Sequence, residues 1–204
     1  MYVCSMNQEV KNALEKGTDY SSFRAMVSEL VAREKSTGEN QSEAYVHYTK
    51  MNDARMRRLD KTVEILPEIA SRIKAISNSQ TWLVITESWC GDAAQVVPII
   101  QKMSDLNDLI TVKVILRDEN LEVMDQYLTN GGRSIPKIVA WNTDSGEELG
   151  DFGPRPAQLQ QMVMDNKHSA NPVPYDEFSK VVQKWYLEDK GASTQSEFLD
   201  AIVA

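Results

Sequence analysis

The stretch Trp89-Cys90-Gly91-Asp92-Ala93 places one cysteine where a strand ends and a helix begins. Residues 81–86, just before it, are apolar or β-branched and predict a buried strand, and residues 93–103 predict a helix. A cysteine at this junction lies near a helix N-terminus, whose unpaired backbone N–H groups and dipole favour an anion. Because the thiolate is the reactive form of cysteine, the position nominates Cys90 as a nucleophile. We expect its sulfur to be presented to solvent.

Further strands, turns and helices follow in a regular order. The pattern predicts a strand at 109–118, a loop and strand at 132–141, a hairpin turn at 142–146 and a strand at 147–152. A proline, Pro98, stands eight positions after Cys90 in the expected helix. A sheet with helices around it is therefore expected.

These residues together resemble the thioredoxin family, whose active site usually reads Trp-Cys-Gly-Pro-Cys. Pro98 stands where thioredoxins kink the helix after the active site, Ile135-Pro136 where they carry a cis-proline, and Gly153 where their last strand ends. The resemblance covers residues 80–167 and is to a bacterial protein of that family. It implies an α/β thioredoxin-like fold, in which a central mixed sheet is flanked by helices.

Helical extensions are expected on both sides of this domain. We divide the chain into a helical N-terminal extension (1–79), the thioredoxin-like domain (80–167) and a C-terminal helical extension (168–204). Apolar spacing predicts helices at 20–31, 42–66, 68–76, 157–166, 175–188 and 196–203, of which 157–166 would be the last helix of the thioredoxin-like unit. Pro67 should end or kink the second of these helices, or open the third. Each extension is too short to bury a core of its own, so both should pack on the domain.

Two substitutions depart from the family pattern. Ala93 replaces the second, resolving cysteine, and Val84 replaces the buried carboxylate six residues before the first cysteine. A lone thiol cannot release its own mixed disulfide and needs an external thiol to do so. Cys4 lies far away in the sequence, and we interpret it as an ordinary thiol near the chain start.

Charged neighbours should act on Cys90 in opposite directions. Asp92 suits the helix dipole but opposes the thiolate, and Glu87, three residues before the cysteine, is expected close by. Arg133 precedes Pro136 by three residues and either faces the sulfur and compensates or is a solvated loop residue. The thiolate should be less favoured than in a reactive dithiol site.

The resemblance also implies a binding surface. Trp89, Gly91, Ile135, Pro136 and Gly153 would form a shallow apolar area around the nucleophile. The loop before the proline would offer backbone groups to an extended partner, as in strand addition.

The function expected from these features is thiol–disulfide exchange by a single cysteine. The substrates would be protein or low-molecular-weight disulfides, and glutathione or another small thiol would resolve the mixed disulfide. One alternative is a non-catalytic interaction module whose helical extensions bind a protein partner. A second is glutathione and iron–sulfur cluster binding like that of single-thiol glutaredoxins.

The composition indicates which kinds of partner, cofactor and compartment to expect. The net charge is −8, and residues 81–204 hold 19 acidic against 10 basic side chains, so no nucleic-acid surface is expected. His47 and His168 have no metal-ligand spacing, and neither a metal nor a bound cofactor is expected. No signal peptide and no apolar stretch of about 20 residues is evident, which predicts a cytoplasmic protein without membrane contact.

Aromatic side chains of the N-terminal helices are expected in the core. The basic run 55–61 reads either as a solvated helix face with i,i+4 pairs or as a docking patch for an acidic partner.

Overall fold

The computed structural model describes residues 7–203. Its four-stranded sheet consists of β1 (Gln80–Thr86), β2 (Ile110–Leu116), β3 (Lys137–Asn142) and β4 (Glu148–Phe152), in the order β2-β1-β3-β4. β1 is parallel to β2 and antiparallel to β3, and β3 and β4 form an antiparallel hairpin. Cys4 lies outside the described residues.

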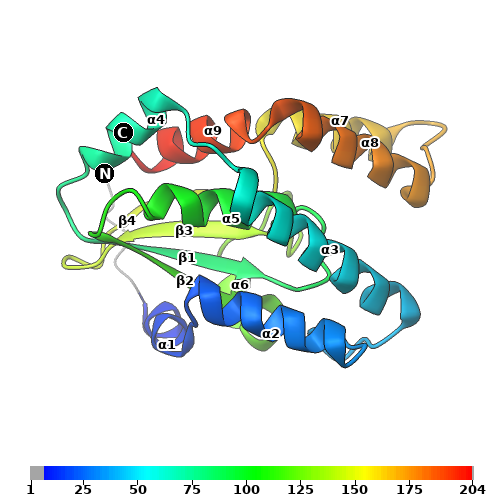
Figure 1. Ribbon diagram of the computed structural model, residues 1–204, viewed down its shortest axis with the longest axis horizontal. Helices are drawn as coiled ribbons and strands as arrows, with labels where there is room; N and C mark the ends of the chain where they lie inside the picture. The colour runs from blue at the N-terminus through cyan, green and yellow to red at the C-terminus, as the bar shows by residue number, and fades with distance from the viewer. Residues whose placement is uncertain (1–6, 204) are drawn as a thin grey trace.

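Helices surround this sheet. They are α1 (Gln8–Lys16), α2 (Tyr20–Ala32), α3 (Glu43–Thr62), α4 (Pro67–Lys74), α5 (Ala93–Ser104), α6 (Leu121–Met124), α7 (Ala157–His168), α8 (Tyr175–Asp189) and α9 (Ala192–Ile202). Figure 1 shows α1, α2 and α6 on one side of the sheet and α4, α5 and α9 on the other. The mixed sheet flanked by helices confirms the α/β fold class that the sequence predicts.

The segment from β1 to β2 positions the site. Both faces of β1 are covered, which explains its unbroken apolar run, and α5 forms the crossover that parallel pairing with β2 requires. α5 is buried along most of its length and contains Pro98. The junction between β1 and α5 therefore sits at the carboxyl end of a central strand, where open α/β sheets place their ligands.

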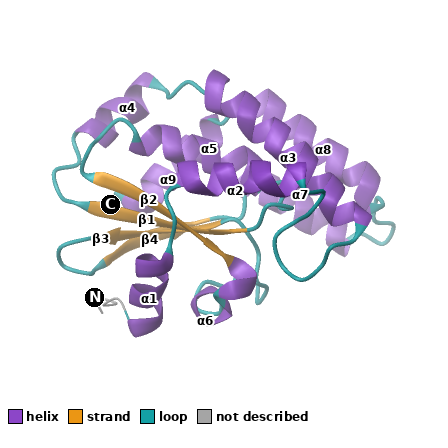
Figure 2. Cartoon of the chain, turned by 60° about the horizontal axis from the view of Figure 1, so that its bottom comes forward, coloured by secondary structure: helices purple, strands orange, loops and turns teal. Residues whose placement is uncertain are grey.

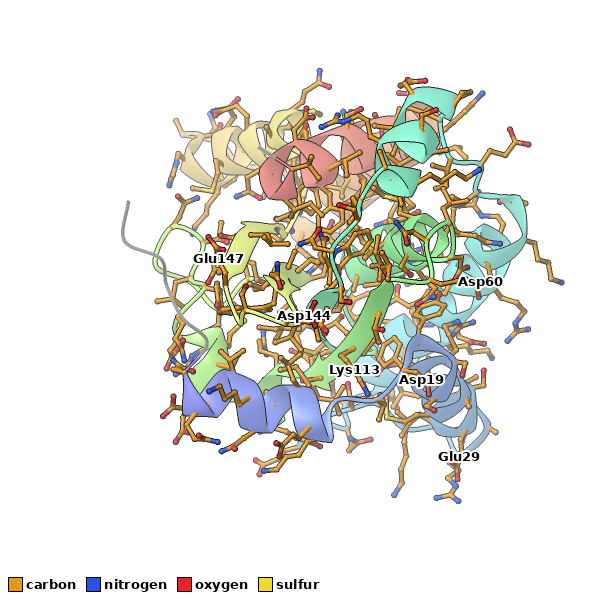
Figure 3. All side chains as sticks on the ribbon, turned by 90° about the vertical axis from the view of Figure 1, so that its left-hand side faces the viewer. Asp19, Glu29, Asp60, Lys113, Asp144 and Glu147 are labelled. Atoms are coloured by element: carbon orange, nitrogen blue, oxygen red, sulfur yellow. The ribbon has the colours of Figure 1, made fainter. Side chains whose placement is uncertain are left out.

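Two features of the N-terminal region were not settled by the sequence. α1 was not expected; Asn7 begins it by accepting a hydrogen bond from the Val10 N–H at 3.0 Å. Pro67 takes the first position of α4, so it opens a helix and does not kink α3. Figure 3 shows Lys113 of β2 on the side of α1 and α2, where its ammonium donates to the Gly17 carbonyl at 3.3 Å.

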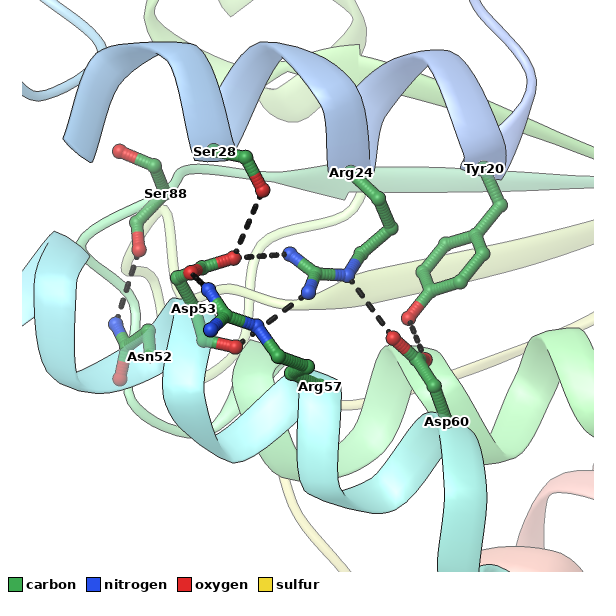
Figure 4. A network of polar contacts seen from close by, with 8 residues as sticks. All are labelled: Tyr20, Arg24, Ser28, Asn52, Asp53, Arg57, Asp60 and Ser88. Atoms are coloured by element: carbon green, nitrogen blue, oxygen red, sulfur yellow. Dashed lines mark hydrogen bonds and ion pairs between the residues drawn. The ribbon is translucent and has the colours of Figure 1, made fainter. Parts of the chain in front are cut away.

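Ion pairs join α2 to α3 (Figure 4). The guanidinium of Arg24 contacts Asp53 at 3.0 Å and Asp60 at 3.2 Å, and Tyr20 donates to Asp60 at 2.6 Å. Arg57 also pairs with the buried Asp53. Within the basic run 55–61, Arg57 is thus an exposed side chain that forms an i,i+4 pair on its own helix.

The C-terminal helix α9 is part of the core, where it packs on β4 and beside α5. Phe198 of α9 meets Trp82 edge to face with ring centroids 4.8 Å apart. The side chain of Gln195 accepts from the Leu66 N–H at 2.9 Å and donates to the Glu64 carbonyl at 3.1 Å. The extension therefore completes the sheet's cover.

Gly150 allows α9 to approach β4 closely, and this generates a stability prediction. Its φ is 153°, and a Cβ there would lie 2.0 Å from the carbonyl oxygen of Ala201. We expect Gly150→Ala to lower the free energy of unfolding by about 3 kcal/mol, measured by urea denaturation.

Gly131→Ala is the matched control. Gly131 has a φ of 75° but open space around its Cβ position, so only backbone strain of about 1 kcal/mol applies. Equal losses in both variants would contradict the close approach of α9.

Candidate functional site

Cys90 lies between β1 and α5, facing the loop before β3. Its thiol donates to the carbonyl oxygen of Ile135 at 3.2 Å, and the N–H of Ala93 donates to Sγ at 3.4 Å. The Ile135–Pro136 peptide bond is cis. The helix start and the proline loop, distant in sequence, thus meet at the sulfur.

The sulfur is recessed, which corrects the expectation that it is presented to solvent. Cys90 is 7% exposed and lies on the wall of a pocket of about 420 Å³. Desolvation by this burial, followed by the charge of Asp92, raises the pKa of Cys90 to about 12. The thiol is reachable through the pocket but is mostly protonated at neutral pH.

Aromatic side chains and arginines surround this pocket. Trp89 packs against Tyr45 with centroids 5.0 Å apart, and the guanidinium carbon of Arg117 lies 5.0 Å from the Trp89 ring centroid. Tyr48 of α3 meets Tyr175 of α8 edge to face at 6.4 Å. Figure 2 shows α3 and α8 on the same side of the molecule. Tyr45 and Tyr48 therefore line the site, contrary to the expectation that they belong to the core.

Buried hydroxyls hold the loop before the cysteine. The Ser88 hydroxyl lies 3.1 Å from the Thr37 hydroxyl and 3.0 Å from that of Thr49, and the Ser88 N–H donates to Thr37 Oγ1 at 3.0 Å. Asn52 donates to the Ser88 carbonyl at 2.9 Å, as Figure 4 shows. Because every bond in this network crosses from the N-terminal region to the site loop, that region fixes the entry of the chain into Cys90.

Asp92 forms a buried ion pair beside the cysteine. Its carboxylate contacts the Arg155 guanidinium at 2.6 Å and accepts a hydrogen bond from the Tyr186 hydroxyl at 3.1 Å. Burial raises the pKa of Asp92, while Arg155 acts to lower it. Asp92 makes no side-chain cap on α5. The Asp92 carboxylate therefore interacts with residues of other segments and not with the N–H groups of its own helix.

Arg133 does not act on the cysteine as one interpretation proposed. Its guanidinium binds Asp125 through two nitrogens at 2.6 and 2.8 Å, because the two side chains face each other on an exposed loop. Arg133 still lines the pocket, and the cation that lowers the pKa of Cys90 is Arg155. The compensating arginine is thus on the segment after β4.

Glu87 supports the structure around the site but does not line the pocket. It is 1% exposed, it accepts a hydrogen bond from the Asp118 N–H at 2.9 Å, and it is not among the residues that line the pocket. Desolvation raises the pKa of Glu87. The side chain therefore joins the loops behind the site.

The expected binding surface divides into two parts. Trp89, Gly91 and Ile135 line the pocket together with Cys90. Pro136 and Gly153 do not; a Cβ on Gly153 would lie 2.2 Å from the Pro136 carbonyl oxygen, so this glycine permits the backbone of the proline loop to pack against the end of β4. Pro136 and Gly153 therefore support the packing of the proline loop and do not line the pocket.

Sequence reasoning missed Arg155 and Tyr186. Arg155 follows Gly153 by two residues in a Gly-Pro-Arg-Pro run, so a charge directly after the last strand was the available signal. Tyr186 lies four residues after the buried Val182, on the inner face of α8. Neither residue could be assigned to Cys90 without the tertiary structure, because both lie far from it in sequence.

Alkylation kinetics test the electrostatics of this site. In a Cys4→Ser background, we expect Asp92→Asn to lower the apparent pKa of iodoacetamide alkylation at Cys90 and to raise the rate at pH 8 roughly tenfold, which corresponds to one pKa unit. Arg155→Gln should slow alkylation, because the thiolate loses the cation that lowers its pKa. Arg133→Gln should leave the apparent pKa unchanged, and a shift in this variant equal to that of Arg155→Gln would contradict the assignment.

Among residues 7–203, no group of three or more His, Cys, Asp or Glu side chains is arranged to hold a metal. None of the helices in the same range is long and apolar enough to cross a membrane.

Comparisons with known proteins agree on the fold. A protein of unknown function from Pseudomonas aeruginosa has 15% sequence identity and a TM-score of 0.60, and the match covers 91% of this chain and 94% of that one. An HIV epitope-scaffold has 16% identity and a TM-score of 0.59, with the same coverage of 91% and 94%. No curated protein matches the sequence. A family model described as thioredoxin matches residues 38–170, which is more than half of the chain, and the protein therefore belongs to the thioredoxin family.

Proposed function

We propose that this protein carries out thiol–disulfide exchange through Cys90 alone. The observation that supports it best is the position of the sulfur, at the start of α5, 3.2 Å from the Ile135 carbonyl and open to a pocket. A disulfide in that pocket would meet the only free thiol among the described residues. We further propose the reducing cytoplasm of a bacterium as its setting, since two cysteines supply no disulfide framework.

The reaction proceeds in two exchanges. In the first, the Cys90 thiol loses its proton to solvent, the thiolate attacks one sulfur of the substrate disulfide, and the other sulfur leaves as a thiolate. In the second, the thiolate of an external small thiol attacks the mixed disulfide, and Cys90 leaves as thiolate. One half of the substrate disulfide is thereby released as a thiolate, and the other half leaves in a disulfide with the external thiol. A second external thiol attacks that disulfide, which releases the second half as a thiolate and leaves the two external thiols joined as a disulfide.

Among residues 7–203 there is no second cysteine to resolve the mixed disulfide. At the position of the usual second cysteine, Ala93 offers only a backbone N–H to the sulfur. The mixed disulfide therefore persists until glutathione or a comparable thiol arrives. The raised pKa of Cys90 keeps the thiolate fraction low at neutral pH, so exchange with an arbitrary disulfide should be slow.

Insulin reduction tests this mechanism. We expect negligible insulin reduction by the reduced wild-type protein alone, and a rate of insulin reduction that rises with added glutathione. Cys90→Ser should abolish that rise, while Cys4→Ser should retain it. Robust catalytic turnover without an added thiol, or activity that survives Cys90→Ser, would rule out single-cysteine exchange.

A scaffold function is the second candidate. Exposed apolar side chains on α8, namely Tyr175, Val181 and Leu187, favour it because such residues are common in contact surfaces. Capture from cell extract with wild type and Cys90→Ala separates the two. A partner set that does not depend on Cys90 supports the scaffold, and a set lost with the thiol supports exchange.

A further inference from the structure

The side chains around Cys90 limit the size of the molecule that can reach its sulfur. α3 and α8 contribute Tyr45, Tyr48 and Tyr175, so the cysteine sits inside a pocket and not on an open surface. With Cys90 only 7% exposed, a disulfide in a folded protein would have to bring its flanking backbone past these rings. The volume of about 420 Å³ instead lies in the usual range for small-molecule sites.

The polar groups of the pocket indicate the chemistry of that partner. Arg117, Arg133 and Arg155 line it, and guanidinium groups bind carboxylates through paired N–H donors. Each of the three already contacts one aspartate, at 2.6–2.8 Å. Of the three, only the pair of Arg133 with Asp125 has both side chains exposed, and exposed pairs are weak.

Unused donors are present in two of these side chains. The Asp125 carboxylate occupies Nε and Nη2 of Arg133, which leaves Nη1 without a hydrogen-bond partner among residues 7–203. Nε of Arg155 is buried and has no partner in the same range.

A fourth arginine adds positive charge at the edge of the pocket. Arg55 of α3 donates to the neutral side chain of Asn52 at 2.9 Å and has no ion pair within the part of the chain that the structure describes. A Cβ on Gly91 would lie 3.6 Å from its Nη1 atom, which places this cation directly beside the cysteine loop. Arg55 does not line the pocket itself, and its charge also acts to lower the pKa of Asp92.

We infer that the pocket binds a low-molecular-weight thiol or disulfide that carries a carboxylate, with its sulfur at Cys90. This inference rests on the proposed exchange reaction and names its substrate class. The carboxylate accepts hydrogen bonds from the arginines, and the Trp89 and tyrosine rings cover the rest of the molecule. Cys90 forms a disulfide with one half of the small disulfide, and the other half leaves as a thiolate. The thiolate of a different thiol-bearing molecule then attacks the sulfur of the bound half, and Cys90 leaves as a thiolate. The bound half is thereby transferred into a disulfide with that second molecule.

Binding of unreactive probes tests the pocket separately from the exchange chemistry. Using full-length Cys90→Ser protein and calorimetry, we expect binding of S-methylglutathione or of S-methyl-N-acetylcysteine, neither of which can form a disulfide. Esterifying the carboxylates of the probe that binds should weaken binding about tenfold, the loss expected for one charge-assisted hydrogen bond. Added salt should weaken binding of the acid more than binding of the ester.

Matched variants locate the carboxylate. Arg133→Gln should weaken binding of the acid about tenfold and binding of the ester little. Arg72→Gln is the control, because Arg72 pairs with Asp200 on α9 and does not line the pocket. Circular dichroism establishes that both variants are folded.

The outcomes distinguish the two proposals. Absence of binding for both probes, or equal binding of acid and ester, overturns the inference even if glutathione-dependent insulin reduction persists. Carboxylate-dependent binding in a protein that shows no Cys90-dependent exchange would instead leave the pocket assignment standing and remove the proposed function.

Discussion

The buried ion pair between Asp92 and Arg155 is the contact on which the site depends. It joins the start of α5 to the segment after β4, and the Tyr186 hydroxyl attaches α8 to the same carboxylate. Breaking a buried pair by removing one partner leaves an uncompensated charge and typically costs about 3–5 kcal/mol. Three segments distant in sequence are thus held around Cys90 by one carboxylate. Burial of the thiol, and after it the charge of this carboxylate, raises the pKa of Cys90.

The helices outside the family's core convert the site from a surface into a pocket. The N-terminal region anchors the loop before the cysteine through hydroxyl contacts at Ser88, and α3 supplies two tyrosines. From the other end of the chain, α8 covers the mouth and α9 packs on the sheet. Cys90 consequently lies on the wall of a pocket of about 420 Å³.

Local patterns predicted the secondary structure well where burial dictates them. The secondary structure of β1 and α5 could be predicted from their apolar patterns. A strand covered on both faces, such as β1, must be apolar throughout. The apolar spacing of α9 indicates that this helix packs but not on which element. The reasoning failed for Tyr45, because an aromatic ring at helical spacing can face a core or a pocket, and only the neighbouring helices decide which.

The sequence by itself determined the family, the strand-to-helix position of Cys90 and the loss of a resolving thiol at Ala93, because these depend on residue identity and local order. The tertiary structure alone decided how exposed the sulfur is and which charges act on it. Arg133 is nearer to Cys90 in sequence, but it pairs with Asp125. Arg155, which pairs with Asp92, is instead the cation that lowers the pKa of Cys90. Electrostatic effects and desolvation depend on distance and burial in space, and neither quantity can be read from separation along the chain.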